Sequence, residues 1–379
     1  MEERRTIDTV LLGAVIGLVA LGLIILSSAT SVLGHERFGD ANYFVRNQFI
    51  FGTILGGIAM VLLARIHYRL WKKFTMPFLV ATIVLLVLVF IPGIGTSIGG
   101  AQRWLSIGGA FLVQPSEIAK LSLVLYLAYW LERRNRLIRS FAGGVLPYIV
   151  LVGFVATLIL LQPDFGTMSL ILLEAFALLF VAGARLRHLV ALGTAGLLAV
   201  AVFIQIAPYR LARITAFLNP ELDPQGIGYH INQALLAIGS GGLFGLGLGH
   251  SRQKVSFLPA VETDSIFAVY AEEFGFLLSL LLIALFLVVA IRGYRIARYA
   301  PDAFSRLVAT GITTWFSFQA LTNIATMVAL LPVTGVPLPF VSYGRSAILA
   351  SLAAVGILLN ISRHIVLPER RFARPRRSR

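Results

Sequence analysis

The sequence contains no cysteine in its 379 residues. This absence excludes a disulfide framework, a thiolate zinc site and a cysteine nucleophile. Charged residues are also scarce, at 13%, which is about half the share typical of soluble domains. Histidine offers no replacement ligand set, since the six residues His35, His67, His188, His230, His250 and His364 show no spacing typical of a metal site.

Apolar residues dominate what remains, at 58% of the chain. They form about ten runs of the length that a membrane-spanning helix requires. One large soluble α/β protein is excluded by the number of these runs. The sequence therefore predicts an all-α integral membrane protein with about ten transmembrane helices, near residues 9–29, 46–65, 75–92, 115–131, 144–161, 167–183, 188–207, 265–291, 306–332 and 346–362.

The charge is unbalanced, with 32 Lys and Arg against 17 Asp and Glu. If the N-terminus lies in the cytoplasm, most of the basic residues fall on the cytoplasmic side, so the positive-inside rule fixes the orientation. Both termini are then cytoplasmic, and the first span is an uncleaved helix. We expect one polytopic membrane domain over 1–367 and a basic tail over 368–379. The tail suits anionic lipid headgroups, whereas nothing in it supports nucleic-acid binding.

One loop is far longer than the others. Between the seventh and eighth spans, about 208–264, the chain stays on the outer face, and long ordered loops tend to be functional. Residues 230–238 have the apolar spacing of a short amphipathic interfacial helix. The glycines of 239–249 permit tight turns and close backbone approach. They do not form a dinucleotide-binding motif, because no strand precedes them and the spacing differs.

Polar clusters gather at this same outer face. Arg103 and Gln114 lie in the loop before the fourth span, and Asp164 lies in the turn between the fifth and sixth. The segment 331–344 contains Ser342 and three prolines, which rule out an ordinary helix and predict a bent or re-entrant segment. Convergent polar groups in a mostly apolar wall are what a binding site requires.

Several acidic residues have two alternative interpretations, one structural and one functional. Asp264 begins the eighth span, where it is either a helix N-cap or a functional acid. Glu272 and Glu273 lie within that span, where acids are costly and seldom idle, unless they pair with arginines of another helix. Glu117 and Lys120 are three residues apart, so they share a helix face and form either an ion pair or part of a site. Glu174 lies in the middle of the sixth span with no predicted partner.

The outer-face cations are also ambiguous. Taken singly, each is a typical contact of lipid headgroups; the set is Arg103, Arg210, Arg213, Arg252 and Lys254. Taken together, they suit a diphosphate or another anionic group.

These motifs closely resemble the SEDS family (shape, elongation, division and sporulation) of peptidoglycan polymerases typified by FtsW and RodA. The tract 249–254 before Phe257-Leu-Pro259, together with Tyr43–Gln48, is closer to the FtsW-like division and sporulation branch. The family usually has glycine at the position of Arg345, whose role is left open. The matching segments are Arg103-Trp104, Gln114–Lys120, Gln162–Thr167, Ala237–Gly242, Phe257–Pro259, Thr263-Asp264, Ala271–Glu273 and Pro332–Gly344.

The resemblance implies a glycosyltransferase that polymerises lipid II at the outer face of the bacterial cytoplasmic membrane, with Asp264 required. It implies a class B penicillin-binding protein as partner, and other divisome or elongasome proteins. It also implies a divalent cation, Mg²⁺ or Mn²⁺, for which no ligand motif is present. Candidate substrate-binding residues are Arg103, Gln114, Glu117, Lys120, Asp164, Arg210, Arg252, Lys254 and Ser342.

Two rival functions remain. Intramembrane Glu117, Lys120, Asp164 and Glu174 are equally compatible with the translocation path of a lipid II flippase. However, the sequence shows no inverted repeat, and its polar groups cluster at one face. A non-catalytic scaffold would leave the outer acids unexplained.

Overall fold

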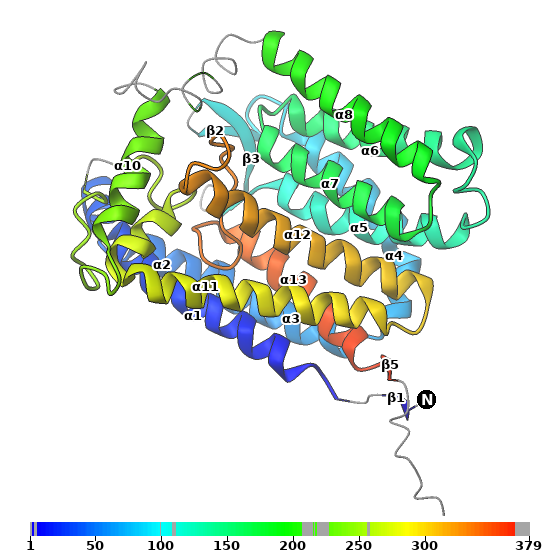
Figure 1. Cartoon of the computed structure of the whole chain (residues 1–379), viewed down its shortest axis with the longest axis horizontal. Helices are drawn as coiled ribbons and strands as arrows, with labels where there is room; N and C mark the ends of the chain where they lie inside the picture. Colours follow the sequence, from blue (N-terminus) through cyan, green and yellow to red (C-terminus); the bar gives the residue numbers. More distant parts are fainter. Residues whose placement is uncertain are drawn as a thin grey trace, which may run out of the picture.

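The computed structural model describes residues 2–3, 6–98, 100–107, 111–206, 215, 217, 227–255 and 258–367. Most of these residues are helical, and the long helices run roughly side by side in one bundle (Figure 1). The short strands β1 (Glu2–Glu3) and β5 (Val366–Leu367) pair with each other, so both ends of the described chain meet at one end of the bundle. We call this the termini end and the opposite one the outer end.

Each of the ten ranges predicted to span the membrane contains a helix or a series of helices. Among the described residues, six of these are long and apolar enough to cross a membrane. The bounds are α1 Thr9–Phe38, α2 Tyr43–Asn47, the π-helix η1 Gln48–Ile54, α3 Leu55–Arg65, α4 Tyr68–Leu88, α5 Pro115–Arg133, the π-helix η2 Phe141–Val145, α6 Leu146–Leu160, α7 Phe165–Val181, α8 Leu186–Ile206, α10 Ile227–Ser240, α11 Ile266–Arg298, α12 Ala303–Met327 and α13 Arg345–Ser362.

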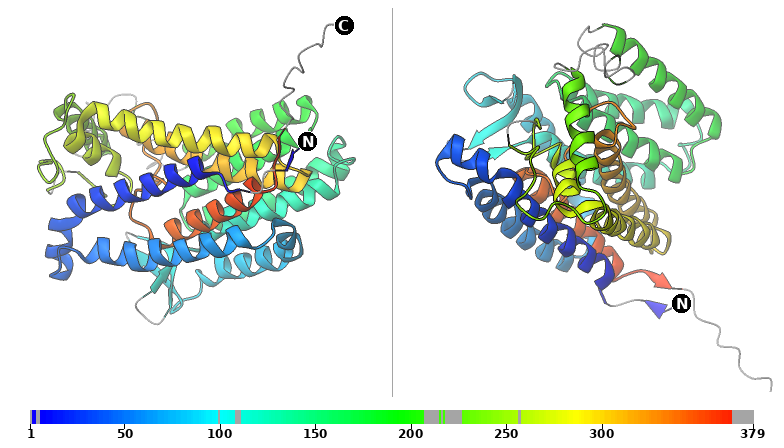
Figure 2. Two further views of the ribbon diagram at one scale, coloured as in Figure 1. Left: turned by 90° about the horizontal axis from the view of Figure 1, so that it is seen from below. Right: turned by 60° about the vertical axis from the view of Figure 1, so that its left-hand side comes forward.

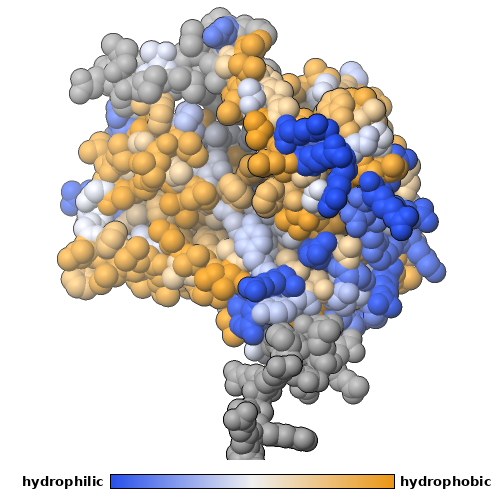
Figure 3. All heavy atoms as spheres, turned by 45° about the vertical axis from the view of Figure 1, so that its right-hand side comes forward, coloured by the Kyte–Doolittle hydropathy of each residue, from blue (hydrophilic) through white to orange (hydrophobic). Residues whose placement is uncertain are grey.

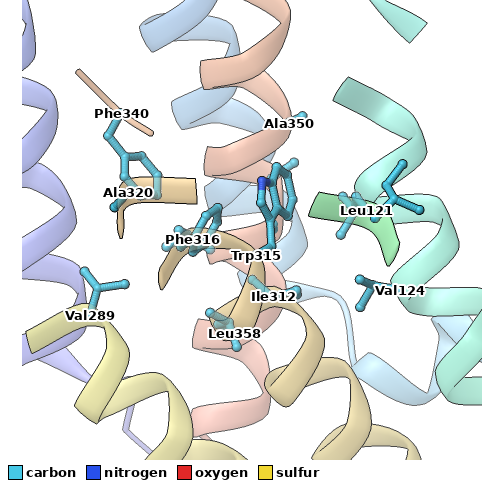
Figure 4. Close-up of a cluster of buried hydrophobic side chains, with 14 of the residues drawn as sticks. Leu121, Val124, Val289, Ile312, Trp315, Phe316, Ala320, Phe340, Ala350 and Leu358 are labelled. Atoms are coloured by element: carbon cyan, nitrogen blue, oxygen red, sulfur yellow. The ribbon is translucent and has the colours of Figure 1, made fainter. Parts of the chain in front are cut away.

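Helices α5 and α12 are among those that do not meet this apolarity criterion. They lie inside the bundle and carry buried polar side chains such as Lys120 and Asn323, which reduce their hydropathy. Their apolar residues build the core around Trp315 and Phe316, which are fully buried. Figure 4 shows Trp315 beside Leu121 of α5, and the ring of Phe316 lies 4.9 Å from that of Phe340.

Local signals set the helix ends. Asp8 caps α1 by accepting a hydrogen bond from the backbone of Leu11, and Gly39 ends that helix with a φ of 67°. Asp302 and Ser305 form a capping box at the start of α12. Such caps satisfy the amides and carbonyls that helix ends leave unpaired.

The predicted helical membrane fold is confirmed, and the loop before α5 adds a small antiparallel sheet. Strands β2 (Gly95–Ile98), β3 (Ala101–Ile107) and β4 (Phe111–Val113) pair in sequence order. Ile98 and Ala101 are partners in the ladder, so the link between them is two residues long. Gly100 has a φ of 78°, which suits a tight hairpin turn. The sheet covers the side of the bundle at its outer end (Figure 2).

The glycine-rich segment 239–249 packs on a break in α11. Gly275 has a φ of 75° and a ψ of −175°, which interrupts the helix and leaves backbone groups unpaired. The amides of Leu246 and Gly247 donate to the carbonyls of Glu272 and Glu273, each at 3.0 Å. A Cβ on Gly245 would lie 2.2 Å from the carbonyl oxygen of Glu273. The predicted close backbone approach is therefore confirmed.

The outer loop also contains the predicted short helix, α10, which packs against α11 and is steeply inclined to it (Figure 1). Ile231, Ala234 and Ala237 form its buried face, as amphipathic spacing predicts. Figure 3 shows hydrophilic side chains gathered near the termini end and apolar ones along the flank. The tail 368–379 and most of 207–226 lie outside the described residues.

Candidate active site

Asp264 lies at the outer end, in the turn that precedes α11. The helix begins at Ile266 with Ser265 as its N-cap residue, so the reading of Asp264 as the cap is wrong. The side chain of Asp264 is half-buried. A Cβ built on Gly335 would lie 3.5 Å from its Oδ2, so the segment 331–344 passes directly beside the carboxylate.

This segment, which we call the proline segment, is irregular, as its three prolines predicted. Gly335 and Phe340 both have positive φ, at 73° and 64°. The Ser342 hydroxyl donates to the carbonyl of Thr263 at 2.6 Å, and the amide of Tyr343 donates to the carbonyl of Glu262 at 2.7 Å. Two consecutive residues of the proline segment therefore hold the backbone of the Asp264 turn.

Buried carboxamide side chains hold the proline segment in turn. Gln48, at the start of η1, donates to the carbonyl of Ser342 at 3.0 Å and accepts from the amide of Gly344 at 3.1 Å. On α12, Gln319 donates to the carbonyl of Pro337 and Asn323 to that of Val336, each at 2.8 Å. Irregular backbone inside a membrane protein requires such partners because no bulk water can satisfy it.

The predicted Glu117–Lys120 neighbours form an ion pair of 2.9 Å, with side chains 4% and 1% exposed. Lys120 also donates to Gln319 at 2.9 Å and lies 4.6 Å from the centre of the Trp315 ring. The ammonium is therefore enclosed by protein groups. Gln319 also donates a hydrogen bond to the carbonyl of Pro337, so it connects the Glu117–Lys120 ion pair to the proline segment.

A third cluster surrounds Asp164, which caps α7 by accepting from the amide of Thr167 at 3.1 Å. Gln114 donates to Asp164 at 3.3 Å, and its backbone amide donates to Ser346 at the start of α13. Arg103 donates to the carbonyls of Gln162 and Pro163 in the turn before Asp164. Three separate outer elements are therefore joined here, as the convergence of their motifs predicted.

The chain that carries these residues is similar to a known protein family and to several named proteins. A sequence model of the family described as "Cell cycle protein", FtsW/RodA/SpoVE, matches residues 8–366. The probable peptidoglycan glycosyltransferase FtsW of Trichlorobacter lovleyi is 42% identical over 355 residues, which cover 94% of this chain and 93% of that protein. Stage V sporulation protein E of Bacillus subtilis is 42% identical over 362 residues, which cover 96% of this chain and 98% of that protein.

The chain belongs to the FtsW/RodA/SpoVE family. Its fold is similar to a solved chain from work titled structural coordination of polymerization and crosslinking by a peptidoglycan synthase complex, with a TM-score of 0.78, 31% identity, and 94% and 98% of the two chains covered. It is also similar to the rod shape determining protein RodA of Thermus thermophilus, with a TM-score of 0.69, 31% identity, and 94% and 97% covered. The predicted family resemblance is confirmed.

Lys254, another predicted cation of this FtsW/RodA/SpoVE family member, pairs with an acid of α11. Lys254 is 2.8 Å from Glu273, whose side chain is fully buried, and it also donates to Ser28 and to the carbonyl of Gly249. Glu272 accepts from the Ser251 hydroxyl and from the amide of Arg252. The two acids therefore pair with a lysine and loop donors, and the alternative reading, in which they pair with arginines of another helix, is wrong.

Lys254 also lines a groove of about 420 Å³ between α1 and residues 248–255. Its three N–H donors are all used by the contacts above. The side chain of Arg252 is exposed. Arg210 lies outside the described residues.

Three acids of this family member have buried oxygens without hydrogen-bond partners among the described residues. They are Glu174 of α7, with both carboxylate oxygens, Glu273, with Oε2, and Glu117, with the Oε2 that forms the ion pair with Lys120. The described residues also contain no group of three or more His, Asp or Glu side chains that could hold a metal ion. The donor set therefore does not specify the divalent cation that the family implies.

Tyr343 lies beside the Asp264 turn, where its amide donates to the carbonyl of Glu262. Burial raises the pKa of the Tyr343 hydroxyl and is the largest influence on it, whereas the nearby Arg345 lowers this pKa and Tyr43 and Glu262 raise it by smaller amounts. The hydroxyl therefore stays neutral at physiological pH. The ring of Tyr343 packs edge-on against Phe44 at 5.0 Å, which orients it.

The side chains that hold the proline segment in this family member were not among the residues predicted from the sequence. Gln48, Gln319 and Asn323 are all at least 98% buried. One signal could have found two of them: Gln319 and Asn323 are four apart within an apolar span, so they share a helix face. Polar residues in such spans are functional candidates by default.

Proposed function

We propose that this protein is a peptidoglycan glycosyltransferase that polymerises lipid II into glycan strands at the outer face of the bacterial cytoplasmic membrane. The observation that carries the proposal is the placement of Asp264. Its half-buried carboxylate lies at the bundle end opposite the termini, in a turn clamped by the proline segment. An acid held in this way, beside a polar cluster in an apolar bundle, suits a catalytic role.

The reaction requires a base and a stabilised leaving group. The 4-hydroxyl oxygen of the acceptor sugar forms a bond to the anomeric carbon of the donor, and the bond from that carbon to the polyprenyl diphosphate oxygen breaks. Asp264 accepts the proton of the hydroxyl, a role worth about 10²–10⁴ in rate. The diphosphate leaves with the bonding electron pair, and cationic or hydrogen-bonding groups stabilise its charge.

The predicted cations divide between direct and indirect roles. Arg103, Lys120 and Lys254 are held by carbonyls or carboxylates of the chain. We therefore assign them to holding the site rather than to binding the diphosphate. Exposed Arg252, and Arg210 beyond the described residues, stay as candidate anion contacts. The divalent cation also stays a prediction, and the proposed reaction includes no step that depends on it.

The partner and orientation follow from the family. We propose that both termini are cytoplasmic, as the basic residues indicate, and that a class B penicillin-binding protein crosslinks the strands made here. Other division or elongation proteins would join this pair. No feature of the chain suggests nucleic acid as a partner.

The test is polymerisation of labelled lipid II by the purified protein with its partner in detergent. Asp264→Asn should lower chain formation by at least about 100-fold, within the range of a lost general base. Glu262→Gln is the matched control, because Glu262 is a half-buried carboxylate in the same turn. It should retain activity within a few-fold.

Near-full chain formation by Asp264→Asn would overturn the assignment of the base. Absence of polymer from the wild-type pair would overturn the activity and favour the lipid II flippase. Detergent has no sides, so polymer made there cannot result from transport.

A further inference from the structure

One buried side chain donates hydrogen bonds both to the Asp264 turn and to the proline segment. Asn323 of α12 is fully buried. Its Nδ2 donates to the carbonyl of Asp264 at 2.8 Å and to the carbonyl of Val336 at 2.8 Å. The first bond holds the residue that bears the predicted base. The second holds the neighbour of Gly335, the residue that passes beside the Asp264 carboxylate.

The carboxamide is oriented by these two bonds. Its Oδ1 has no hydrogen-bond partner among the described residues. A buried acceptor left unpaired is destabilising, so a polar side chain kept only for packing would be a poor choice at this position. The contacts that distinguish Asn323 from an apolar residue of similar size are the two donated bonds.

The neighbouring bonds do not replace it. Ser342 and Tyr343 hold the carbonyls of Thr263 and Glu262, which lie before Asp264 in the chain. Asn323 bonds to Asp264 itself and fixes its peptide plane relative to α12. A rotation of that plane would swing the side chain on the same Cα, and a misplacement of about 1 Å can cost 10²-fold in rate.

We propose that Asn323 is a positioning residue that sets the Asp264 carboxylate against the proline segment for proton transfer. This inference rests on the proposed function. It predicts that a change at residue 323 slows the chemical step while substrate binding is largely retained.

The kinetic test uses the full chain with its partner transpeptidase and labelled lipid II. Asn323→Ala should lower kcat at least ~10-fold, because the carboxylate loses its fixed position, with KM changed by less than about 3-fold. Asn323→Asp should be slower still, because its oxygens face the two carbonyls at 264 and 336. Thr313→Val is the matched control. Thr313 is fully buried on the same helix and donates only within α12, to the carbonyl of Ala309.

A second readout does not depend on activity. The chain has no cysteine, so a single cysteine at position 262 can carry a spin label alone. The label's spectrum reports the mobility of the Asp264 turn. Mobility should rise in the Asn323→Ala background and stay unchanged with Thr313→Val.

Unchanged mobility and a kcat within about 2-fold of wild type would overturn the positioning role. The positioning role would also be overturned if Asn323→Ala lost no more activity than the Thr313→Val control. The proposed function fails differently, since it falls if the wild-type protein makes no polymer or if Asp264→Asn remains active. An active wild type, an inactive Asp264→Asn and a fully active Asn323→Ala would refute the positioning role alone.

Discussion

Replacing Gly275 with alanine tests the break in α11. Gly275 has a φ of 75° and a ψ of −175°, a region that is almost exclusive to glycine. A Cβ there would lie 2.2 Å from the backbone nitrogen of Gly245 and 2.6 Å from the carbonyl carbon of Phe244. Both contacts are with backbone, so no flexible side chain can move aside.

The cost can be worked from these contacts. An L-residue in this conformation is strained by about 1–3 kcal/mol. Four backbone hydrogen bonds join the glycine-rich segment to α11 around the break, at 2.9 to 3.2 Å. Each contributes about 0.5–1.5 kcal/mol. We expect Gly275→Ala to lower the free energy of unfolding by about 2 kcal/mol or more, since strain and at least one lost bond act together.

Thermal unfolding in detergent, followed by the fluorescence of the four tryptophans, measures this loss. Gly57→Ala is the matched control, because a Cβ at this helical glycine meets nothing within 4 Å. That control should be neutral or gain up to about 1 kcal/mol.

Helix α11 has another way to respond, by straightening into a continuous helix. Its own backbone bonds would then replace those to residues 242–247, and stability would be retained. A cysteine at position 246 would in that case react faster with a maleimide. The reasoning about the break at Gly275 is refuted if Gly275→Ala unfolds at the same temperature as the Gly57→Ala control and the thiol at position 246 reacts at its original rate.

Two further predictions concern charges away from Asp264. Lys254→Met leaves the buried Glu273 carboxylate without its cation, so we expect a loss of about 3–5 kcal/mol in unfolding experiments. Adding Glu273→Gln to Lys254→Met should restore part of the lost stability. The control is Lys73→Met, which removes an exposed lysine and should change stability little. A Lys254→Met protein as stable as wild type would contradict the buried ion pair. Burial raises the pKa of Asp302, but hydrogen bonds from Ser305 and Tyr68 outweigh it and lower that pKa overall. The ionised form therefore stabilises the fold above the ordinary pKa of aspartate, and this contribution is lost as pH falls through the lowered value. The stability gap between wild type and Asp302→Asn should close on acidification, and a gap that is constant with pH would count against this reasoning.

Local patterns in the chain determined its class and its helices. Apolar runs of membrane length indicated the helices, because burial in hydrocarbon demands such runs. The three prolines of residues 331–344 predicted irregular backbone, since proline cannot donate to a helix. Helical spacing also placed Glu117 and Lys120 on one helix face, with an ion pair as one of two readings, and the structure shows the ion pair.

Only the tertiary structure decided which polar groups meet across the bundle. Asn323 and Asp264 are 59 residues apart, and Gln48 and Ser342 are 294 apart. No spacing rule reaches across such separations. Lys254 read as an exposed anion contact, yet packing places it against Glu273, because the break at Gly275 lets the glycine-rich segment approach α11. Hydrophobic periodicity describes one helix at a time, whereas these contacts depend on how several helices pack together.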